Sequence, residues 1–350
     1  MTRDIVISID AMGGDSGPAA VVGGMVMSAS KNDEIRYIVH GDEAELRPLI
    51  EKHSALNDIV EIRHCSDVIS MTEKPSRAMR SGKDSSMWGT LKTVEMGDAT
   101  VAVSCGNTGA LMAISMLRLR RAPGVDRPAI AVLWPSRSAA GHSVVLDVGA
   151  DIRAEARDLV QYAIMGVEYA RQGLDLTTPR VGLLNVGTEE HKGRVALHEA
   201  SELLEALAAE PDSGMNFIGF VEGSDIGSAN VDVIVTDGFT GNVALKTAEG
   251  TATLIRGFLR DAMEHTVFSR IGALFALTSL RRLQKRLDPR RRNGGVFLGL
   301  NGAVVKSHGG ADATGVSAAI KLAFRLAKNG FTQKVAERVA KAAKPEGHPE

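Results

Sequence analysis

Ten short runs of apolar and β-branched residues recur along this chain of 350 residues, and longer segments with helical periodicity separate them. This alternation is typical of βαβ units, in which a helix carries the chain from one parallel strand to the next. We therefore expect an α/β fold built on a mostly parallel sheet. The predicted strands are Ile5–Asp10, Arg36–His40, Val60–His64, Thr100–Ser104, Ala129–Leu133, Ser143–Asp147, Arg180–Asn185, Phe217–Val221, Val233–Thr236 and Ala303–Lys306. The predicted helices include Asp42–Lys52, Ser85–Met96, Ala154–Arg171, Val195–Ala209 and Ala311–Ala327.

One segment, Thr251–Leu287, breaks the alternation, because it contains no strand pattern and is predicted to form two successive helices. The basic run Arg281–Arg292 overlaps its end and holds seven positive charges and one negative charge. We expect residues 251–292 to form a helical hairpin that projects from the α/β body toward an anionic membrane, a partner protein or a second copy of the chain. Its predicted apolar tip consists of Val267, Ile271, Leu274, Phe275 and Leu277.

Composition excludes several classes of protein. With 41 basic and 42 acidic residues the net charge is −1, which excludes a generally polybasic nucleic-acid binder, and 4% aromatic residues disfavour stacking platforms for single strands. Two cysteines, Cys65 and Cys105, cannot form a disulfide scaffold, and His191, His198 and His265 lack the spacing of metal ligands. The first ten residues lack the apolar core of a signal peptide, so we expect a cytoplasmic protein without a metal site or a nucleic-acid partner.

Five glycine-bearing turns directly follow predicted strands. Such turns lie at the carboxyl ends of parallel strands, where ligands bind, and several open a helix whose free N–H groups favour a phosphate or carboxylate. A single turn of this kind is more often only a tight connection, but five that are rich in Asn, Thr, Asp and Glu favour an anion site. No Walker loop or Gly-x-Gly-x-x-Gly pattern is present, so nucleotide binding is not expected. The turns are 10–15, 104–109, 147–151, 185–193 and 236–242.

Candidate site residues lie in or beside these turns. Lys192 and Lys246 can neutralise phosphate charge, and the Asn242 amide can donate to an oxyanion; the alternatives are solvated lysines and a helix cap. Cys105 is interpreted as a small buried side chain rather than an activated thiolate. The candidate phosphate- or substrate-binding residues are Asp10, Gly13, Gly14, Gly106, Asn107, Thr108, Gly109 and His308, the last with a surface or packing role as its alternative.

Several motifs together resemble the PlsX family of phosphate acyltransferases. They include Asp10-Ala-Met-Gly-Gly-Asp, Gly106-Asn-Thr-Gly-Ala-Leu, Leu146-Asp-Val-Gly-Ala and the long stretches that begin at Gly182 and Thr236. The resemblance extends over nearly the whole chain. The family usually has Ala where Cys105 stands and Asn where Asp151 stands, which argues against a cysteine nucleophile and against Asp151 as a site residue.

The resemblance implies a three-layer α/β/α fold related to phosphotransacetylases and isocitrate dehydrogenases, in a catalytic domain over 1–343 with a flexible tail at 344–350. It also implies a homodimer without cofactor that converts acyl-acyl carrier protein and inorganic phosphate to acyl-phosphate. It implies association with the inner face of the membrane and delivery to an acyl-phosphate-using glycerol-phosphate acyltransferase. Two alternatives are a phosphotransacetylase-like enzyme that uses acyl-coenzyme A, and a membrane-surface scaffold without activity.

Overall fold

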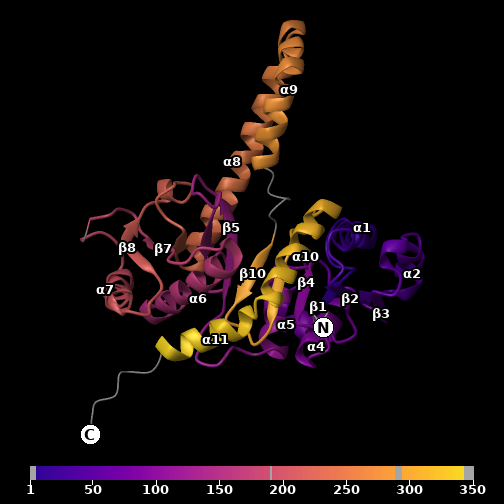
Figure 1. The fold of residues 1–350 in the computed structure, drawn as a ribbon, viewed down its shortest axis with the longest axis horizontal. Helices are drawn as coiled ribbons and strands as arrows, with labels where there is room; N and C mark the ends of the chain where they lie inside the picture. Colours follow the sequence, from indigo (N-terminus) through magenta and orange to yellow (C-terminus); the bar gives the residue numbers. More distant parts are fainter. Residues whose placement is uncertain (1–4, 190, 288–293, 343–350) are drawn as a thin grey trace.

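The computed structural model describes residues 5–189, 191–287 and 294–342. Figure 1 shows a twisted sheet that runs through the body, with helices on both faces and a helical arm projecting from one side. The strands are β1 (Ile5–Asp10), β2 (Ile35–Gly41), β3 (Val60–His64), β4 (Val101–Ser104), β5 (Ala129–Pro135), β6 (His142–Leu146), β7 (Arg180–Leu184), β8 (Asn216–Val221), β9 (Val233–Val235), β10 (Gly295–Leu298) and β11 (Ala303–Lys306). The helices are α1 (Gly17–Ala29), α2 (Glu43–Glu51), α3 (Pro75–Ser81), α4 (Ser86–Glu95), α5 (Thr108–Arg118), α6 (Ala156–Leu174), α7 (Val195–Ala209), α8 (Gly238–Glu264), α9 (Val267–Leu287), α10 (Ala313–Lys328) and α11 (Phe331–Ala342).

The 11 strands form one sheet in the order β3-β2-β1-β4-β11-β10-β5-β6-β9-β7-β8. The pairs β11–β10, β10–β5 and β5–β6 are antiparallel and the other neighbouring pairs are parallel, which confirms the prediction of a mostly parallel sheet. These three reversals have a consequence for the site. Strands β6 to β9 run opposite to β1, β2, β3, β4 and β11, so the turns that follow the strands fall into two groups rather than one.

Alternate residues of each central strand face two separate core layers, as the pleat of a strand requires. Val101 and Val103 of β4 belong to the layer that contains α1 and α10, whereas Ala102 between them belongs to the layer that contains α4 and α5. All three residues are fully buried. Because both faces are covered, the strands read as continuous apolar runs, and the fold has three layers as the resemblance implies.

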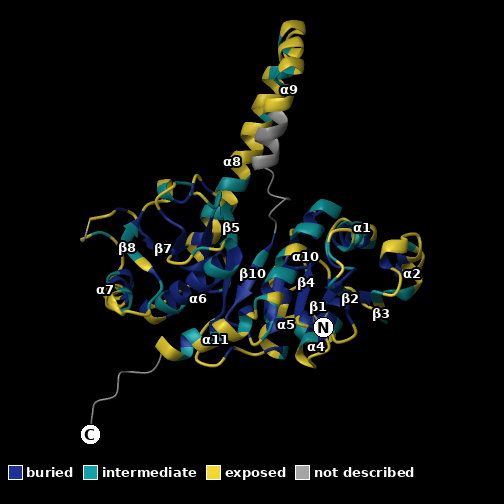
Figure 2. Cartoon of the chain, viewed as in Figure 1, coloured by how far each residue is buried: buried dark blue, intermediate teal, exposed yellow. Residues whose placement is uncertain are grey.

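The arm in Figure 1 consists of α8 and α9, which lie side by side as a helical hairpin. The segment that we predicted to start at Thr251 starts instead at Gly238, because α8 continues without interruption from the turn after β9. Figure 2 shows that the described part of the hairpin is mostly exposed beyond the base of α8. No helix in the described part of the chain combines the length and the apolar character needed to cross a membrane.

Some sequence-based expectations concern residues that the structure does not describe. The predicted tail at 344–350 and residues 288–293 lie outside the described ranges, as do the side chains of Leu277 and of the whole basic run. The division into a catalytic domain over 1–343 and a tail therefore stays a prediction.

Candidate functional site

The first group of turns is organised around Asp10 at the end of β1. This buried carboxylate accepts hydrogen bonds from the hydroxyls of Ser86 and Ser104, each at 2.6 Å, and from the Gly13 N–H at 3.1 Å. The three donors come from α4, β4 and the turn after β1. Asp10 therefore holds these elements together, and its oxygens are already engaged by the protein.

Gly13 and Gly14 allow the turns after β1, β4 and β11 to come into contact. A Cβ on Gly13 would lie 2.8 Å from the Gly106 backbone nitrogen, and a Cβ on Gly14 would lie 2.7 Å from the Gly309 carbonyl oxygen. Gly14 also has φ +97°, which other residues rarely adopt. The N–H of Asp15 donates to the Gly309 carbonyl at 2.8 Å. Two of the five predicted turns therefore meet, together with a third turn after β11.

Asn107 is the N-cap of α5. Its Oδ1 accepts from the Ala110 N–H at 3.0 Å, and its Nδ2 donates to the carbonyls of Ser70, Met71 and Glu73 at 3.3, 2.9 and 2.9 Å. The side chain thus ties the helix to the loop that precedes α3. We infer that Asn107 has a structural role at this edge of the site, because both its amide oxygen and its amide nitrogen already form hydrogen bonds within the protein.

The remaining predicted residues of the first group are exposed. Thr108 and Gly109 lie in the first turn of α5, where the helix N-terminus is open to an anion. His308 lies on the turn after β11, and its Nδ1 accepts from the Gly310 N–H at 3.1 Å. Their positions leave each of them accessible at the junction of the three turns.

Lys306 belongs to this group, although we did not predict it as a site residue. It ends β11, is only 8% exposed, and donates to the carbonyls of Cys105, at 3.2 Å, and Ser307. Burial lowers its pKa, the carboxylates of Asp10 and Asp15 act in the opposite direction, and the positive charge of Lys246 on α8 lowers it to a smaller extent. The signal in the sequence was a lysine that ends an apolar strand and precedes a Ser-His-Gly-Gly turn.

Cys105 is buried in the same junction. Burial raises the pKa of its thiol to about 11, so the thiol is neutral at pH 7. A neutral and buried thiol is a poor nucleophile. The environment of Cys105 therefore agrees with its interpretation as a packing residue.

The second group of turns is organised around Asp147, which follows β6. Its buried carboxylate accepts from the backbone N–H groups of Ile130, Gly149, Ala150 and Asp151 at 2.7 to 3.1 Å. Burial raises its pKa, and these four N–H groups act in the opposite direction. The carboxylate therefore holds the backbone of the 147–151 turn in one conformation.

The first turns of α8 pack against the 147–151 turn. The Gly238 N–H donates to the Asp151 carbonyl at 2.7 Å, and a Cβ on Gly241 would overlap the Asp147 carbonyl oxygen. The helix is capped by Asp237, whose side chain accepts from the Thr240 N–H at 2.8 Å. Asp237 occupies the cap position, so the alternative role of helix cap does not apply to Asn242.

Asn242 faces the 147–151 turn from α8, since its Oδ1 lies 3.7 Å from the place of a Cβ on Gly149. Lys192 lies in the turn after β7, where it pairs with Glu189 at 2.6 Å and its carbonyl accepts from Asn185 at 2.8 Å. The structure therefore brings three of the predicted turns into this group. Arg194, which we did not predict, connects the turn after β7 to α8 through its ion pair with Asp237.

Lys246 belongs to the second group through its position on α8. It lies one helical turn beyond Asn242 and pairs with Glu249 at 2.8 Å on the exposed side of α8. Surface pairs of this kind are weak and exchange readily. Its charge still acts on Lys306 of the first group, so the two ammonium groups lie within electrostatic range of each other.

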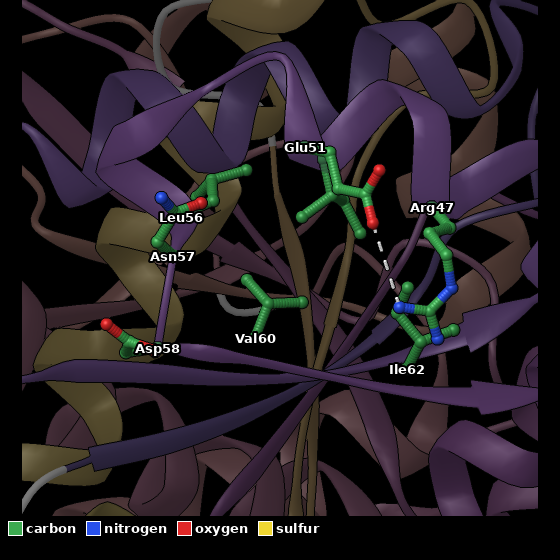
Figure 3. Close-up of a pocket in the computed structure, with 8 residues that line it drawn as sticks. Arg47, Glu51, Leu56, Asn57, Asp58, Val60 and Ile62 are labelled. Carbon is green, nitrogen blue, oxygen red and sulfur yellow. Dashed lines mark ion pairs between the residues drawn. The ribbon is translucent and has the colours of Figure 1, made fainter.

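Two other features of the structure do not extend the site. In the described ranges, no group of three or more His, Cys, Asp or Glu side chains is placed to hold a metal ion. A hollow of about 180 Å³ lies between α2 and β3, lined in part by Arg47, Glu51 and Ile62, and Figure 3 shows the Arg47–Glu51 ion pair across it. None of its lining residues comes from the glycine turns.

Comparisons with known proteins agree with this architecture. Phosphotransacetylases from Staphylococcus aureus and Streptococcus pyogenes share the fold, each with a TM-score of 0.60, at 16% and 17% identity; the matches cover 93% of this chain and 94% and 95% of theirs. At this level of identity the likeness establishes the fold alone.

Sequence comparison gives closer relatives. A family model described as "Fatty acid synthesis protein" matches residues 5–334. Proteins named phosphate acyltransferase from Dinoroseobacter shibae and a Jannaschia species are 65% and 64% identical to this chain; each match covers 97% of this chain, and 88% and 92% of the relative. The glycine turns, the three-layer fold and these relatives together lead to one assignment: the chain belongs to the PlsX family of phosphate acyltransferases and is an acyltransferase enzyme.

Proposed function

We propose that this enzyme forms acyl-phosphate from long-chain acyl-acyl carrier protein and inorganic phosphate, for phospholipid synthesis. The observation that carries the proposal is the junction of three glycine turns around a buried lysine, Lys306. Backbone N–H groups and lysines are the groups that bind phosphate without a metal. The family assignment supports the same chemistry.

The proposed reaction needs no nucleophile from the protein. An oxygen of hydrogen phosphate attacks the thioester carbonyl carbon, the tetrahedral intermediate collapses, and the carbon–sulfur bond breaks. The sulfur leaves as a thiolate and takes up the proton that the phosphate loses. The protein has to align phosphate with the carbonyl and stabilise the oxyanion.

The site residues receive their roles from this reaction. We assign Asn242 as an oxyanion donor, with Lys192 and Lys246 as the cations that hold phosphate and the developing charge. The substrate-binding residues in the same proposal are Asp10, Gly13, Gly14, Gly106, Asn107, Thr108, Gly109 and His308, of which Asp10 and Asn107 act through the loops that they hold.

The hairpin favours a protein-borne acyl chain over acyl-coenzyme A, which remains the alternative substrate. Phe258, Phe268 and Phe275 are 64%, 86% and 88% exposed along α8 and α9, an apolar surface that a small soluble substrate does not require. We propose that the hairpin attaches the enzyme, as a cytoplasmic homodimer, to the anionic inner face of the membrane. The acyl-phosphate would pass there to a glycerol-phosphate acyltransferase that uses it.

A turnover assay tests the substrate. The protein is mixed with palmitoyl-acyl carrier protein and phosphate, and acyl-phosphate is trapped with hydroxylamine; palmitoyl-coenzyme A is compared at equal concentration. We expect phosphate-dependent product that persists in chelator, with a clear preference for the carrier protein. Equal or greater turnover of the coenzyme A thioester would favour the alternative. The Cys105→Ala variant is expected to keep its activity, and a folded but inactive variant would contradict direct attack by phosphate.

A further inference from the structure

Lys306 is a buried cation whose partners are neutral. Its ammonium donates to two backbone carbonyls, those of Cys105 and Ser307, and in the described ranges it forms no ion pair with a carboxylate. An ammonium group has three N–H donors, so one remains beyond the two carbonyls. Burial of a charge that has no direct ion pair is costly, and such a group with a donor to spare is a candidate for ligand binding.

The surroundings of Lys306 come from four elements. Cys105 follows β4, Asp10 ends β1, Asp15 lies in the turn before α1, and Lys246 projects from α8. The two carboxylates act on Lys306 only through space, and Asp10 is already bound by two serine hydroxyls. Lys246 repels it. This repulsion is smaller than the attraction of either carboxylate, and the geometric feature that favours an anion is the N–H of Lys306 beyond the two carbonyls.

We propose that Lys306 is a phosphate-binding residue of this site, and that its ammonium helps to hold the inorganic phosphate that attacks the thioester. This inference rests on the proposed function and adds a residue to it. The carbonyls of Cys105 and Ser307 orient the ammonium. Because the turns around them are rich in glycine, they would present backbone atoms rather than side chains to the bound phosphate. The buried charge then strengthens the electrostatic contact, because water screens it little.

Direct binding of inorganic phosphate, measured by titration calorimetry, tests the proposal without turnover. The variant is Lys306→Met, which removes the charge at similar volume, and the control is Lys321→Met, an exposed lysine on α10. Loss of one phosphate or oxyanion donor typically costs about 10²–10³ in rate, so we expect kcat/KM for phosphate to fall by that factor and calorimetric binding to disappear in Lys306→Met. Lys321→Met should bind and turn over as wild type does.

A second variant keeps the test valid if Lys306→Met does not fold, which circular dichroism and melting would reveal. In Lys246→Met, Lys306 is intact but loses a neighbouring positive charge, so its pKa rises. The alkaline limb of the kcat/KM profile for phosphate should therefore move to higher pH, whatever the absolute activity. An unchanged limb would overturn the proposal, and so would wild-type phosphate binding in a folded Lys306→Met.

The outcomes separate this inference from the proposed function. Wild-type enzyme that binds phosphate through Lys306 but forms no acyl-phosphate would remove the proposed function and leave the phosphate site. Acyl-phosphate formation by Lys306→Met with wild-type KM for phosphate would remove Lys306 from the site and leave the function.

Discussion

At the scale of single residues, the buried polar side chains at strand ends hold the site together and the exposed ones are available to the substrate. Asp10 and Asp147 are identifiable from the sequence because each ends an apolar run and precedes a glycine turn. The two hydroxyl donors of Asp10 are not identifiable in this way, since they come from residues 76 and 94 positions away. We did not select Lys306 as a site residue from the sequence, because its neighbour Cys105 is also far away in the sequence and only the fold brings the two together.

Asn242 and Lys192 are predicted to contribute to turnover rather than to stability. Asn242 is exposed, Lys192 is partly exposed, and the helix beside Asn242 has its own cap in Asp237. Asn242→Ala and Lys192→Ala should therefore lower kcat/KM by about 10²–10³ while the melting temperature stays within a few degrees of wild type. Steady-state acyl-phosphate assays and thermal melts check this. Near-wild-type turnover would remove the residue concerned from the site.

His40 is predicted to make stability depend on pH. It is buried, its Nε2 lies 2.9 Å from the Thr93 hydroxyl, and burial together with the Arg63 charge lowers its pKa from 6.5 to about 4. Between these two values the unfolded chain binds a proton that the folded protein does not. Stability is therefore complete above pH 6.5 and falls as the pH drops toward 4, by up to about 3 kcal/mol.

Urea unfolding at pH 7.5 and pH 5.0 measures this dependence. His40→Gln keeps a hydrogen-bonding group near Thr93 but does not titrate, so its free energy of unfolding should fall less between the two pH values than that of wild type. Parallel falls in the two proteins would show that His40 is not the cause.

At the scale of elements, the junction of α8 with the 147–151 turn depends on Gly241. Because a Cβ there would overlap the Asp147 carbonyl oxygen, Gly241→Ala should shift the first turns of α8, lower activity at least tenfold and reduce stability by about 1–3 kcal/mol. Gly250→Ala, in the same helix with open space around it, is the matched control. It should be neutral or stabilise by up to about 1 kcal/mol, because alanine favours the helix. Equal effects of the two changes on melting and turnover would contradict the close contact.

The elements that the sequence predicts best are those with a clear apolar pattern. All ten predicted strands are present, and α7 has the predicted bounds. The strand β10 was missed because its four residues follow a basic run and give no alternation to recognise. The helix α1 has no polar face that would identify it in the sequence. It packs closely on α10, so that a Cβ on Gly24 would lie 2.5 Å from the Val316 side chain. Its glycines, which look like loop signals in the sequence, are contact points between helices.

At the scale of the whole molecule, the hairpin of α8 and α9 is predicted to bind anionic vesicles through its tip. The structure places the end of the hairpin at the turn between Glu264 and Val267, two helical turns before the predicted tip residues Leu274 and Phe275. Val267 and Phe268 are exposed at this turn, so Val267→Glu with Phe268→Glu should abolish co-sedimentation while the mass in solution stays that of the wild type. Leu254→Glu with Ile255→Glu places the same charges on exposed positions of α8 further from this turn and is the matched control, which should still bind vesicles. A tip variant that becomes monomeric yet still binds vesicles would show that the tip is a dimer interface.

The pairing of β4 with β11 also bears on how the molecule is made. Lys306 and its partner Cys105 are 201 residues apart, and at roughly 5–20 residues per second the ribosome needs about 10–40 s to cover that distance. During this time one edge of β4 has no partner strand, and the turns after β1 and β4 lack the turn after β11 that they contact in the finished protein. The nascent chain must therefore carry an unfinished sheet edge until β11 emerges, and an open edge of this kind is a template for pairing with another chain that a chaperone would cover.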